Sequence, residues 1–273
     1  MKSLDCNESL CHIQLKKSTA KFYEDCFFEI ILKDVLHPGG LELTERLANF
    51  ADIDEKSSVL DIASGKGKSA IFLAKNFNCS IIGVDLSKGI VRKAIDLANT
   101  EMFSDRNKIS FKVSDAEKLP FKTGAFDVVI SECALCLFPN KKSALTEMYR
   151  VLKDDGKIAL SDVTLENTSR ELKNKLLFFG CLTGAEALIV LQKMIEDIGF
   201  TDVNAIDSSQ AVVDLYKSVK RRRYLLKHLL KVVGNSKNGD VNVKNLVEFG
   251  KTAEQLILEG KLGYGIIIGK KTN

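Results

Sequence analysis

Acidic side chains follow four of the short apolar runs in the first half of this 273-residue sequence. Asp61 lies at the end of the first run, Asp85 ends the second, and Asp115 and Glu132 follow the next two. Short apolar runs of this kind are typical of buried parallel strands. A carboxylate at the end of the second strand, about twenty residues past a glycine turn, can accept hydrogen bonds from both hydroxyls of a ribose. The pattern therefore favours the binding of a nucleotide.

A turn of small residues comes directly after the first apolar run. Gly65 and Gly67 let the backbone turn sharply and let a ligand approach without meeting a Cβ atom. The segment that follows, Ala70–Ala74, has the spacing of an amphipathic helix, whose first N–H groups can receive a polar or anionic group. A P-loop is not favoured, because its first glycine would have to stand where the strand residue Ile62 lies. Gly65, Gly67 and Ala70 match the spacing of a dinucleotide-binding motif, but this match alone is weak evidence for a dinucleotide cofactor.

The strand-end Asp61, followed by Gly65 and Gly67, resembles the first motif of class I S-adenosylmethionine (SAM) methyltransferases. The resemblance implies that these residues surround the methionine part and the ribose of the SAM cofactor. It also implies that Asp85 accepts hydrogen bonds from the ribose hydroxyls and that Asp115 bonds the exocyclic amine of the adenine. The cofactor-binding residues that the resemblance implies are Tyr23, Asp61, Ala63, Ser64, Gly65, Gly67, Asp85, Leu86, Ser87, Asp115, Ala116 and Ser131.

The segment Ser131–Asn140 occupies the position at which, in that family, the substrate and the transferred methyl group meet. Glu132 is expected either to orient a substrate donor or to act as a base. The alternative is that Glu132 is a polar residue that caps a turn at the end of a strand. The catalytic candidates are Glu132, Cys133 and Cys181, and the predicted function is methyl transfer from SAM to a small-molecule acceptor.

A narrower resemblance, to arsenite methyltransferases and their relatives, concerns the acceptor. It is carried by ISEC at 130–133, FPNK at 138–141 and GCLTGA at 180–185. In those enzymes several thiolates hold trivalent arsenic, a soft ion that suits sulfur ligands, and Cys181 matches one of the cysteines. This chain departs from them because no cysteine follows Cys181. Arsenite therefore stays an alternative acceptor, and the other interpretation makes Cys181 a small apolar residue that fills the core.

The pair Cys133 and Cys136 leaves a further alternative, a non-catalytic SAM-binding or thiol-redox module. A zinc site would require a second pair of this kind, and the three histidines show no ligand spacing, so no metal is expected. The basic run Lys220–Arg223 is expected to form the solvent-exposed face of a helix. Without interleaved aromatic residues it does not favour nucleic-acid binding.

Seven apolar segments are expected to form the strands that position these residues. They are 59–62, 79–86, 109–113, 126–131, 157–163, 201–206 and 262–269. The periodicity also predicts helices over Leu41–Phe50, Ser169–Phe179, Gly184–Ile198, Gln210–Val233 and Val241–Leu258, and another around Tyr23. The fold class is α/β, with a Rossmann-like, seven-stranded, mostly parallel sheet, helices on both faces, and an antiparallel edge formed by the last two strands.

A single methyltransferase domain over residues 1–273 is expected. It divides into an N-terminal helical lid (1–50), a SAM-binding core (51–206), a helical insertion before the last strand (207–260) and a terminal strand (261–273). In the family an aromatic side chain of such a lid, here Tyr23, often reaches into the site.

The composition is that of an ordinary globular protein, with 45% hydrophobic and 28% charged residues. The net charge of +4 is too small to indicate nucleic acid or membrane as a partner. No apolar run approaches the roughly 18 residues of a bilayer span, and the acidic N-terminus does not read as a signal peptide. The seven cysteines read as thiols. The protein is expected to be cytoplasmic, as a monomer or homodimer.

Overall fold

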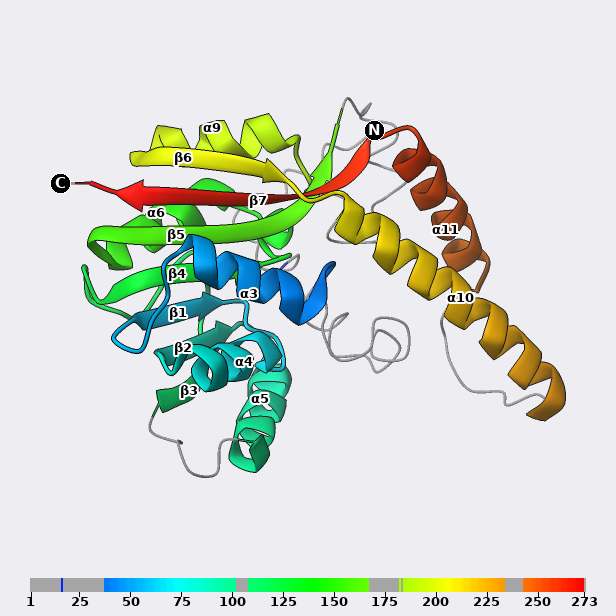
Figure 1. Ribbon diagram of the computed structural model, residues 1–273, viewed down its shortest axis with the longest axis horizontal. Helices are drawn as coiled ribbons and strands as arrows, with labels where there is room; N and C mark the ends of the chain where they lie inside the picture. Colours follow the sequence, from blue (N-terminus) through cyan, green and yellow to red (C-terminus); the bar gives the residue numbers. More distant parts are fainter. Residues whose placement is uncertain are drawn as a thin grey trace, which may run out of the picture.

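The computed structural model describes residues 16, 37–101, 108–166, 182, 184–233 and 243–272, and within 222–249 it describes the backbone alone. Three of the expectations above, namely Tyr23, Cys181 and the helix over 169–179, lie outside the described residues. The division into lid, core and insertion stays a prediction. The seven-stranded α/β fold itself is confirmed (Figure 1).

The sheet has the strand order β3-β2-β1-β4-β5-β7-β6, and β7 runs antiparallel to both of its neighbours. The strands are β1 (Ser58–Ile62), β2 (Ser80–Asp85), β3 (Ile109–Val113), β4 (Phe126–Glu132), β5 (Leu152–Leu165), β6 (Phe200–Asp207) and β7 (Leu262–Lys271). Strand order reverses between β1 and β4. In open α/β sheets, ligands bind at such a switch point, beyond the carboxyl ends of the strands.

β5 is longer than the sequence predicts. The expected strand covers residues 157–163, whereas the observed strand begins at Leu152 and ends at Leu165. β7 pairs with β5 from Lys157 to Leu165, and Leu152 pairs with Phe126 of β4 across an irregularity in the register. The charged residues 153–155 lie within the strand, between Leu152 and Lys157, where the pairing with β4 resumes.

Helices cover both faces of the sheet. The first face carries α3 (Gly40–Phe50), α4 (Lys68–Phe77) and α5 (Lys88–Glu101), and the second carries α6 (Lys141–Val151) and α9 (Leu188–Ile198). Between β6 and β7, α10 (Gln210–Val233) and α11 (Val243–Leu258) extend beyond one end of the sheet (Figure 1). This pair is the helical insertion that was expected before the last strand.

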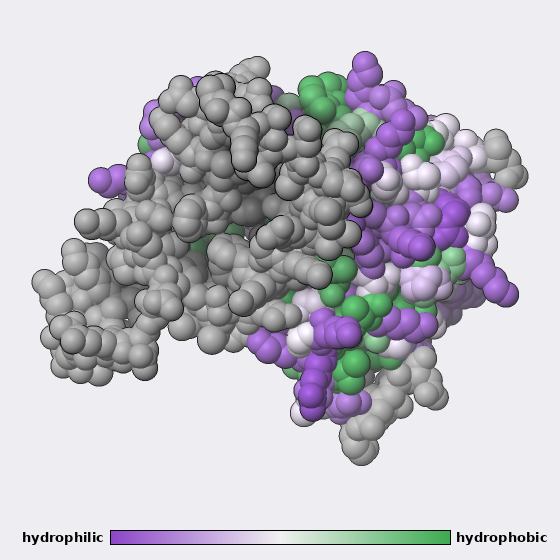
Figure 2. Space-filling model, turned by 180° about the vertical axis from the view of Figure 1, so that it is seen from behind, coloured by the Kyte–Doolittle hydropathy of each residue, from purple (hydrophilic) through white to green (hydrophobic). Residues whose placement is uncertain are grey.

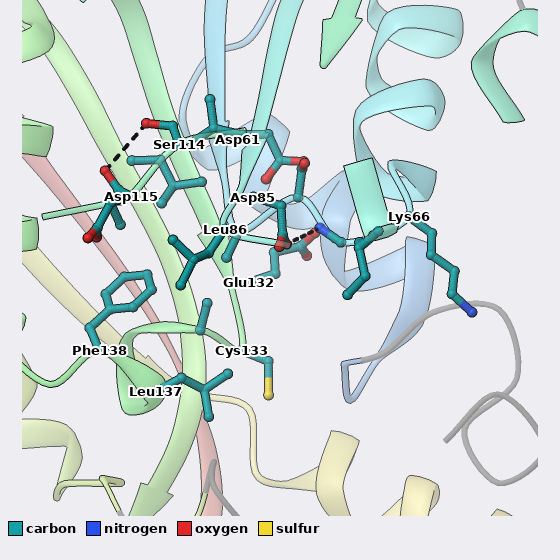
Figure 3. Close-up of a pocket in the computed structure, with 18 of the residues that line it drawn as sticks. Asp61, Lys66, Asp85, Leu86, Ser114, Asp115, Glu132, Cys133, Leu137 and Phe138 are labelled. Carbon is teal, nitrogen blue, oxygen red and sulfur yellow. Dashed lines mark hydrogen bonds between the residues drawn. The ribbon is translucent and has the colours of Figure 1, made fainter. Parts of the chain in front are cut away.

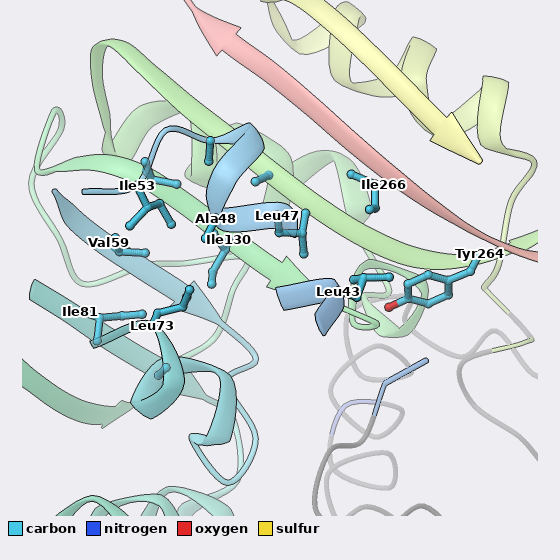
Figure 4. Packing of buried hydrophobic residues seen from close by; sticks show 14 of the residues in the cluster. Leu43, Leu47, Ala48, Ile53, Val59, Leu73, Ile81, Ile130, Tyr264 and Ile266 are labelled. Atoms are coloured by element: carbon cyan, nitrogen blue, oxygen red, sulfur yellow. The ribbon is translucent and has the colours of Figure 1, made fainter. Parts of the chain in front are cut away.

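Two hydrophobic clusters hold the layers together, one on each face of the sheet. On the first face, one cluster includes Leu47 of α3, Leu73 of α4, Val59 of β1 and Ile130 of β4, and Leu43 of α3 lies beside Tyr264 of β7 (Figure 4). Burial of each such side chain contributes about 1.5–3 kcal/mol relative to exposure. The packing of α3 matters for the site because the residues just before it enter the pocket described below.

The surface is mixed in character. Hydrophilic residues dominate the coloured part of the face in Figure 2, and hydrophobic residues form separate patches among them. Within the part of the chain that the structure describes, no helix is long and apolar enough to cross a membrane.

Candidate functional site

An open cavity lies at the carboxyl ends of β1, β2, β3 and β4, where the strand order reverses (Figure 3). Its empty volume is about 1220 Å³, solvent at the mouth included. Of the predicted cofactor-binding residues, those that line it are Asp61, Ala63, Ser64, Gly65, Asp85, Leu86, Asp115 and Ala116. Glu132 and Cys133, two of the three catalytic candidates, line it as well.

The glycine turn forms one wall of this cavity. Three of its residues have a left-handed backbone, with φ values of 58° at Ala63, 54° at Gly65 and 78° at Gly67. Gly67 itself does not line the cavity. It begins α4, and a Cβ atom at this position would come within 2.4 Å of the ring of Phe111. Gly67 therefore serves the close packing of the turn on the sheet.

Asp85 ties the end of β2 to the glycine turn. Its Oδ2 accepts a hydrogen bond from the backbone N–H of Gly65 at 3.1 Å, and its Oδ1 accepts one from the N–H of Ser87 at 2.9 Å. Ser87 does not line the cavity, because its hydroxyl accepts the N–H of Ile90 and so caps α5. Asp85 is thus held firmly at the cavity edge by two backbone donors.

Asp61 is buried at the floor of the cavity, with 3% of its surface exposed. Its Oδ2 has no hydrogen-bond partner. Burial, followed by the nearby charges of Glu132 and Asp85, raises the pKa of this carboxyl well above its ordinary value. A buried carboxylate oxygen without a partner is costly, and a positively charged or hydrogen-bond-donating ligand would remove this cost.

Asp115 lies at the opposite side of the cavity, after β3. Lys16 donates to its Oδ2 at 2.7 Å and also pairs with Glu117 at 2.7 Å. The Oδ1 of Asp115 accepts the backbone N–H of Glu117. Lys16 was not predicted from the sequence, since nothing in its neighbourhood marks it as a site residue. It lines the cavity although it lies 99 residues away from its partner.

Glu132 lies at the end of β4 with its side chain 5% exposed. Thr44 of α3 donates to its two carboxylate oxygens at 3.0 and 3.1 Å. The Nε2 of His37 lies 3.4 Å from its Oε2. His37 also lines the cavity. From the sequence, the histidines were considered only as possible metal ligands. The position of His37 before a Pro-Gly-Gly turn does not mark it as a site residue.

The remaining predicted residues lie beside the cavity or outside the described part of the chain. Ser131 does not line the cavity, because its hydroxyl donates to the carbonyl of Ile62 at 2.8 Å and links β4 to β1. Cys133 adopts a left-handed φ of 54°. Cys136 is buried, and its thiol is hydrogen-bonded to Asp162. The described residues include no cluster of three side chains that could hold a metal ion.

Comparisons with known proteins show the family to which this chain belongs. A family profile described as "Methyltransferase domain" matches residues 53–198. An uncharacterized protein of Haemophilus influenzae is 40% identical over 135 residues, which are 49% of this chain and 53% of that protein. The arsenite methyltransferase of Aquipseudomonas alcaligenes is 32% identical over 159 residues, 55% of this chain and 45% of that protein. The chain thus spans about half the length of these curated relatives.

Among solved structures, phosphoethanolamine N-methyltransferase 2 of Haemonchus contortus in complex with SAM superimposes with a TM-score of 0.75. The alignment covers 90% of this chain and 56% of that one at 20% identity, which shows a shared fold. The match to the family profile covers more than half of the chain. The chain therefore belongs to the methyltransferase domain family, and its fold is that of the class I SAM-dependent methyltransferases.

Proposed function

We propose that this protein binds SAM in the cavity at the carboxyl ends of β1 to β4 and transfers its methyl group to a small molecule. The observation that carries the proposal is the buried, unpartnered Oδ2 of Asp61 among neighbouring carboxylates. SAM carries a positive sulfonium and an ammonium group, and it supplies a methyl group that is already activated for transfer. The chain's own contribution is to bind, to align and to exclude water.

The lining residues fit the parts of this cofactor. Asp61 would face its positively charged methionine part, where a donor would satisfy the orphaned oxygen. Asp85 is fixed by two backbone N–H groups and would receive the ribose hydroxyls. Asp115 and the apolar Leu86 would bound the adenine. The small residues of the glycine turn leave room for close approach of the ligand.

The acceptor would enter between β4 and the segment that follows it. Glu132, Cys133, Leu137 and Phe138 line this part of the cavity (Figure 3). One or two polar groups among apolar side chains are typical of pockets for small molecules. This composition supports a small acceptor with a polar reacting group.

The arsenite and thiol-redox alternatives both depend on cysteines. Of the three cysteines described, Cys133 lines the cavity, whereas Cys79 and Cys136 are buried away from it. A thiolate trio is therefore not assembled among the described residues, and Cys181 lies outside them. Arsenite remains an acceptor to be tested, because of the relative named for that activity.

Calorimetric titration with SAM tests the proposal. The wild-type protein is expected to bind, and Asp85→Asn is expected to bind about 10- to 100-fold more weakly, because a charge-assisted hydrogen bond contributes about 1.5–3 kcal/mol. Asp127→Asn is the control, since Asp127 pairs with Ser58 and Lys153 at the other end of the sheet. Transfer of labelled methyl to phosphoethanolamine, other small amines and arsenite then tests the acceptor. Failure of the wild type to bind SAM would refute the proposal.

A further inference from the structure

A buried network of polar side chains connects Glu132 to the segment that leads into α3. The Nε2 of His37 lies 3.3 Å from the hydroxyl of Ser69, which lies 3.3 Å from the hydroxyl of Thr44. Thr44 donates to Glu132, and His37 Nε2 lies 3.4 Å from Glu132 Oε2, which closes the ring. His37, Thr44 and Ser69 are each buried, at 9% exposure or less. Such a buried network requires a partner for every polar atom.

The surroundings of the imidazole assign its protons. Nδ1 lies 3.2 Å from the carbonyl oxygen of Pro38, which can only accept, so Nδ1 carries a hydrogen. In the neutral ring Nε2 is then a bare acceptor, and the hydroxyl of Ser69 can donate to it. In the protonated ring Nε2 carries a hydrogen and can donate to the carboxylate of Glu132. The same positions therefore accommodate both protonation states, and Nε2 is the atom that gains the proton.

His37 and Glu132 reach the cavity, whereas Thr44 and Ser69 support them from behind. The turn that precedes α3 leaves no room for a side chain at Gly39, because a Cβ atom there would lie 2.6 Å from the Cβ of Leu43. The charged and titratable side chains that line the cavity with His37 are Lys16, Asp61, Lys66, Lys68, Asp85, Asp115, Glu132 and Cys133.

Methyl transfer changes the charge in this cavity. The sulfur of SAM is positive before transfer and neutral afterwards, and Asp61, Asp85 and Glu132 then lose a positive counter-charge. Like charges in one buried site favour the uptake of a proton. The imidazole of His37, with Nε2 at 3.4 Å from Glu132 Oε2, offers a place for that proton.

We propose that Glu132 and His37 together accept the proton of the methyl acceptor, which is thus a nitrogen or oxygen nucleophile that still carries hydrogen. This inference rests on the proposed function above. The N–H or O–H bond of the acceptor breaks and the proton passes by way of Glu132 to Nε2 of His37. The new bond to the methyl group forms, and the electron pair of the broken carbon–sulfur bond stays on sulfur. The net charge of the site is the same before and after the reaction.

The test uses proton linkage and needs no knowledge of the acceptor. SAM and its demethylated product, S-adenosylhomocysteine, are titrated by calorimetry in buffers of different ionisation enthalpy between about pH 5 and pH 8, where histidine titrates. The product is expected to take up more protons on binding than SAM does, by a difference that approaches one proton per site. His37→Gln keeps a polar group near Nε2 but cannot titrate, and it is expected to lose this difference. His228→Gln, in α10, controls for the loss of one imidazole.

The outcomes separate this inference from the function on which it rests. If both ligands bind to the wild type with equal proton uptake, the proton-acceptor role is refuted while SAM binding stands. A difference that persists in a folded His37→Gln protein would assign the proton to another group and would also refute it. Absence of binding by either ligand would overturn both proposals. If His37→Gln does not fold, equal proton uptake in the wild type still refutes the role, and His37→Asn takes the place of His37→Gln to assign the proton.

Discussion

Replacement of Asp61 by asparagine should stabilise the ligand-free protein while it abolishes cofactor binding. In the folded chain, burial and the charges of Glu132 and Asp85 raise the pKa of Asp61 above its ordinary value of 3.8. For an acid, a raised pKa in the folded state means that ionisation opposes folding. This penalty is complete above the raised pKa and disappears as the pH falls towards 3.8. Asparagine has nearly the same shape and no charge.

The magnitude follows from the orphaned Oδ2 atom. Asparagine keeps a buried polar group at this position but removes its charge. Burial of an unpartnered charge costs more than burial of an unpartnered neutral group, which itself costs about 1–3 kcal/mol, so loss of the charge in Asp61→Asn should raise the free energy of unfolding at neutral pH by about 1–3 kcal/mol. For a chain of this size each kcal/mol moves Tm by about 2–4 °C, which predicts a rise of about 2–12 °C. The advantage over wild type should shrink in acid, where Asp61 becomes neutral.

Asp162 is the matched control. It is as buried as Asp61, with 3% exposure, but both of its oxygens accept backbone hydrogen bonds, from Cys136 at 2.8 Å and from Val163 at 2.7 Å. Asp162→Asn would place an amide N–H₂ against one of these donors and should destabilise the protein by about 1–3 kcal/mol.

Thermal unfolding measured with and without SAM distinguishes the two variants. SAM at 100 times its Kd should stabilise the wild type by about 2.7 kcal/mol and should have little effect on Asp61→Asn. A variant less stable than wild type at neutral pH, or one that still binds SAM normally, would contradict the reasoning about Asp61.

Two other measurements examine the cavity wall. Ala63→Gly should stabilise the protein by about 0.5–1 kcal/mol in urea unfolding, because relief of about 1–2 kcal/mol of left-handed strain exceeds the entropy cost of glycine of about 0.5–1 kcal/mol. The control Ala98→Gly, within α5, should instead cost about 1 kcal/mol, and equal effects would refute the strain argument. Iodoacetamide should label Cys133 and leave Cys79 unreacted, since burial raises the pKa of Cys79 to about 11. SAM at 100 times its Kd should slow the labelling of Cys133 up to about a hundredfold, and unchanged labelling would place Cys133 outside the bound site.

Several site residues could be predicted from the sequence because they lie at the ends of strands. Asp61, Asp85, Asp115 and Glu132 each follow a short apolar run, and parallel strands bring their carboxyl ends to one edge of the sheet. All four line the same cavity. Local pattern and chain order were sufficient here, since neither depends on distant segments.

The roles of the residues between these acids depended on their exact places in the turns and strands. Gly67, Ser87 and Ser131 were expected to bind the cofactor, but they start α4, cap α5 and link β4 to β1. In a strand or a turn, neighbouring residues face different sides. Residues that belong to the same sequence motif can therefore lie in different surroundings, one in the cavity and the next against the sheet.

The sequence by itself determined the strand–turn–helix order, the fold class and the acids at the strand ends, because hydrophobic period and turn chemistry are local properties. Only the tertiary structure decided that Lys16 reaches Asp115 and that His37 and Thr44 reach Glu132. Those partners are separated by 88 residues or more. The contacts of His37 and Thr44 with Glu132 arise because α3 packs on the sheet, and no sequence pattern within either segment predicts this packing.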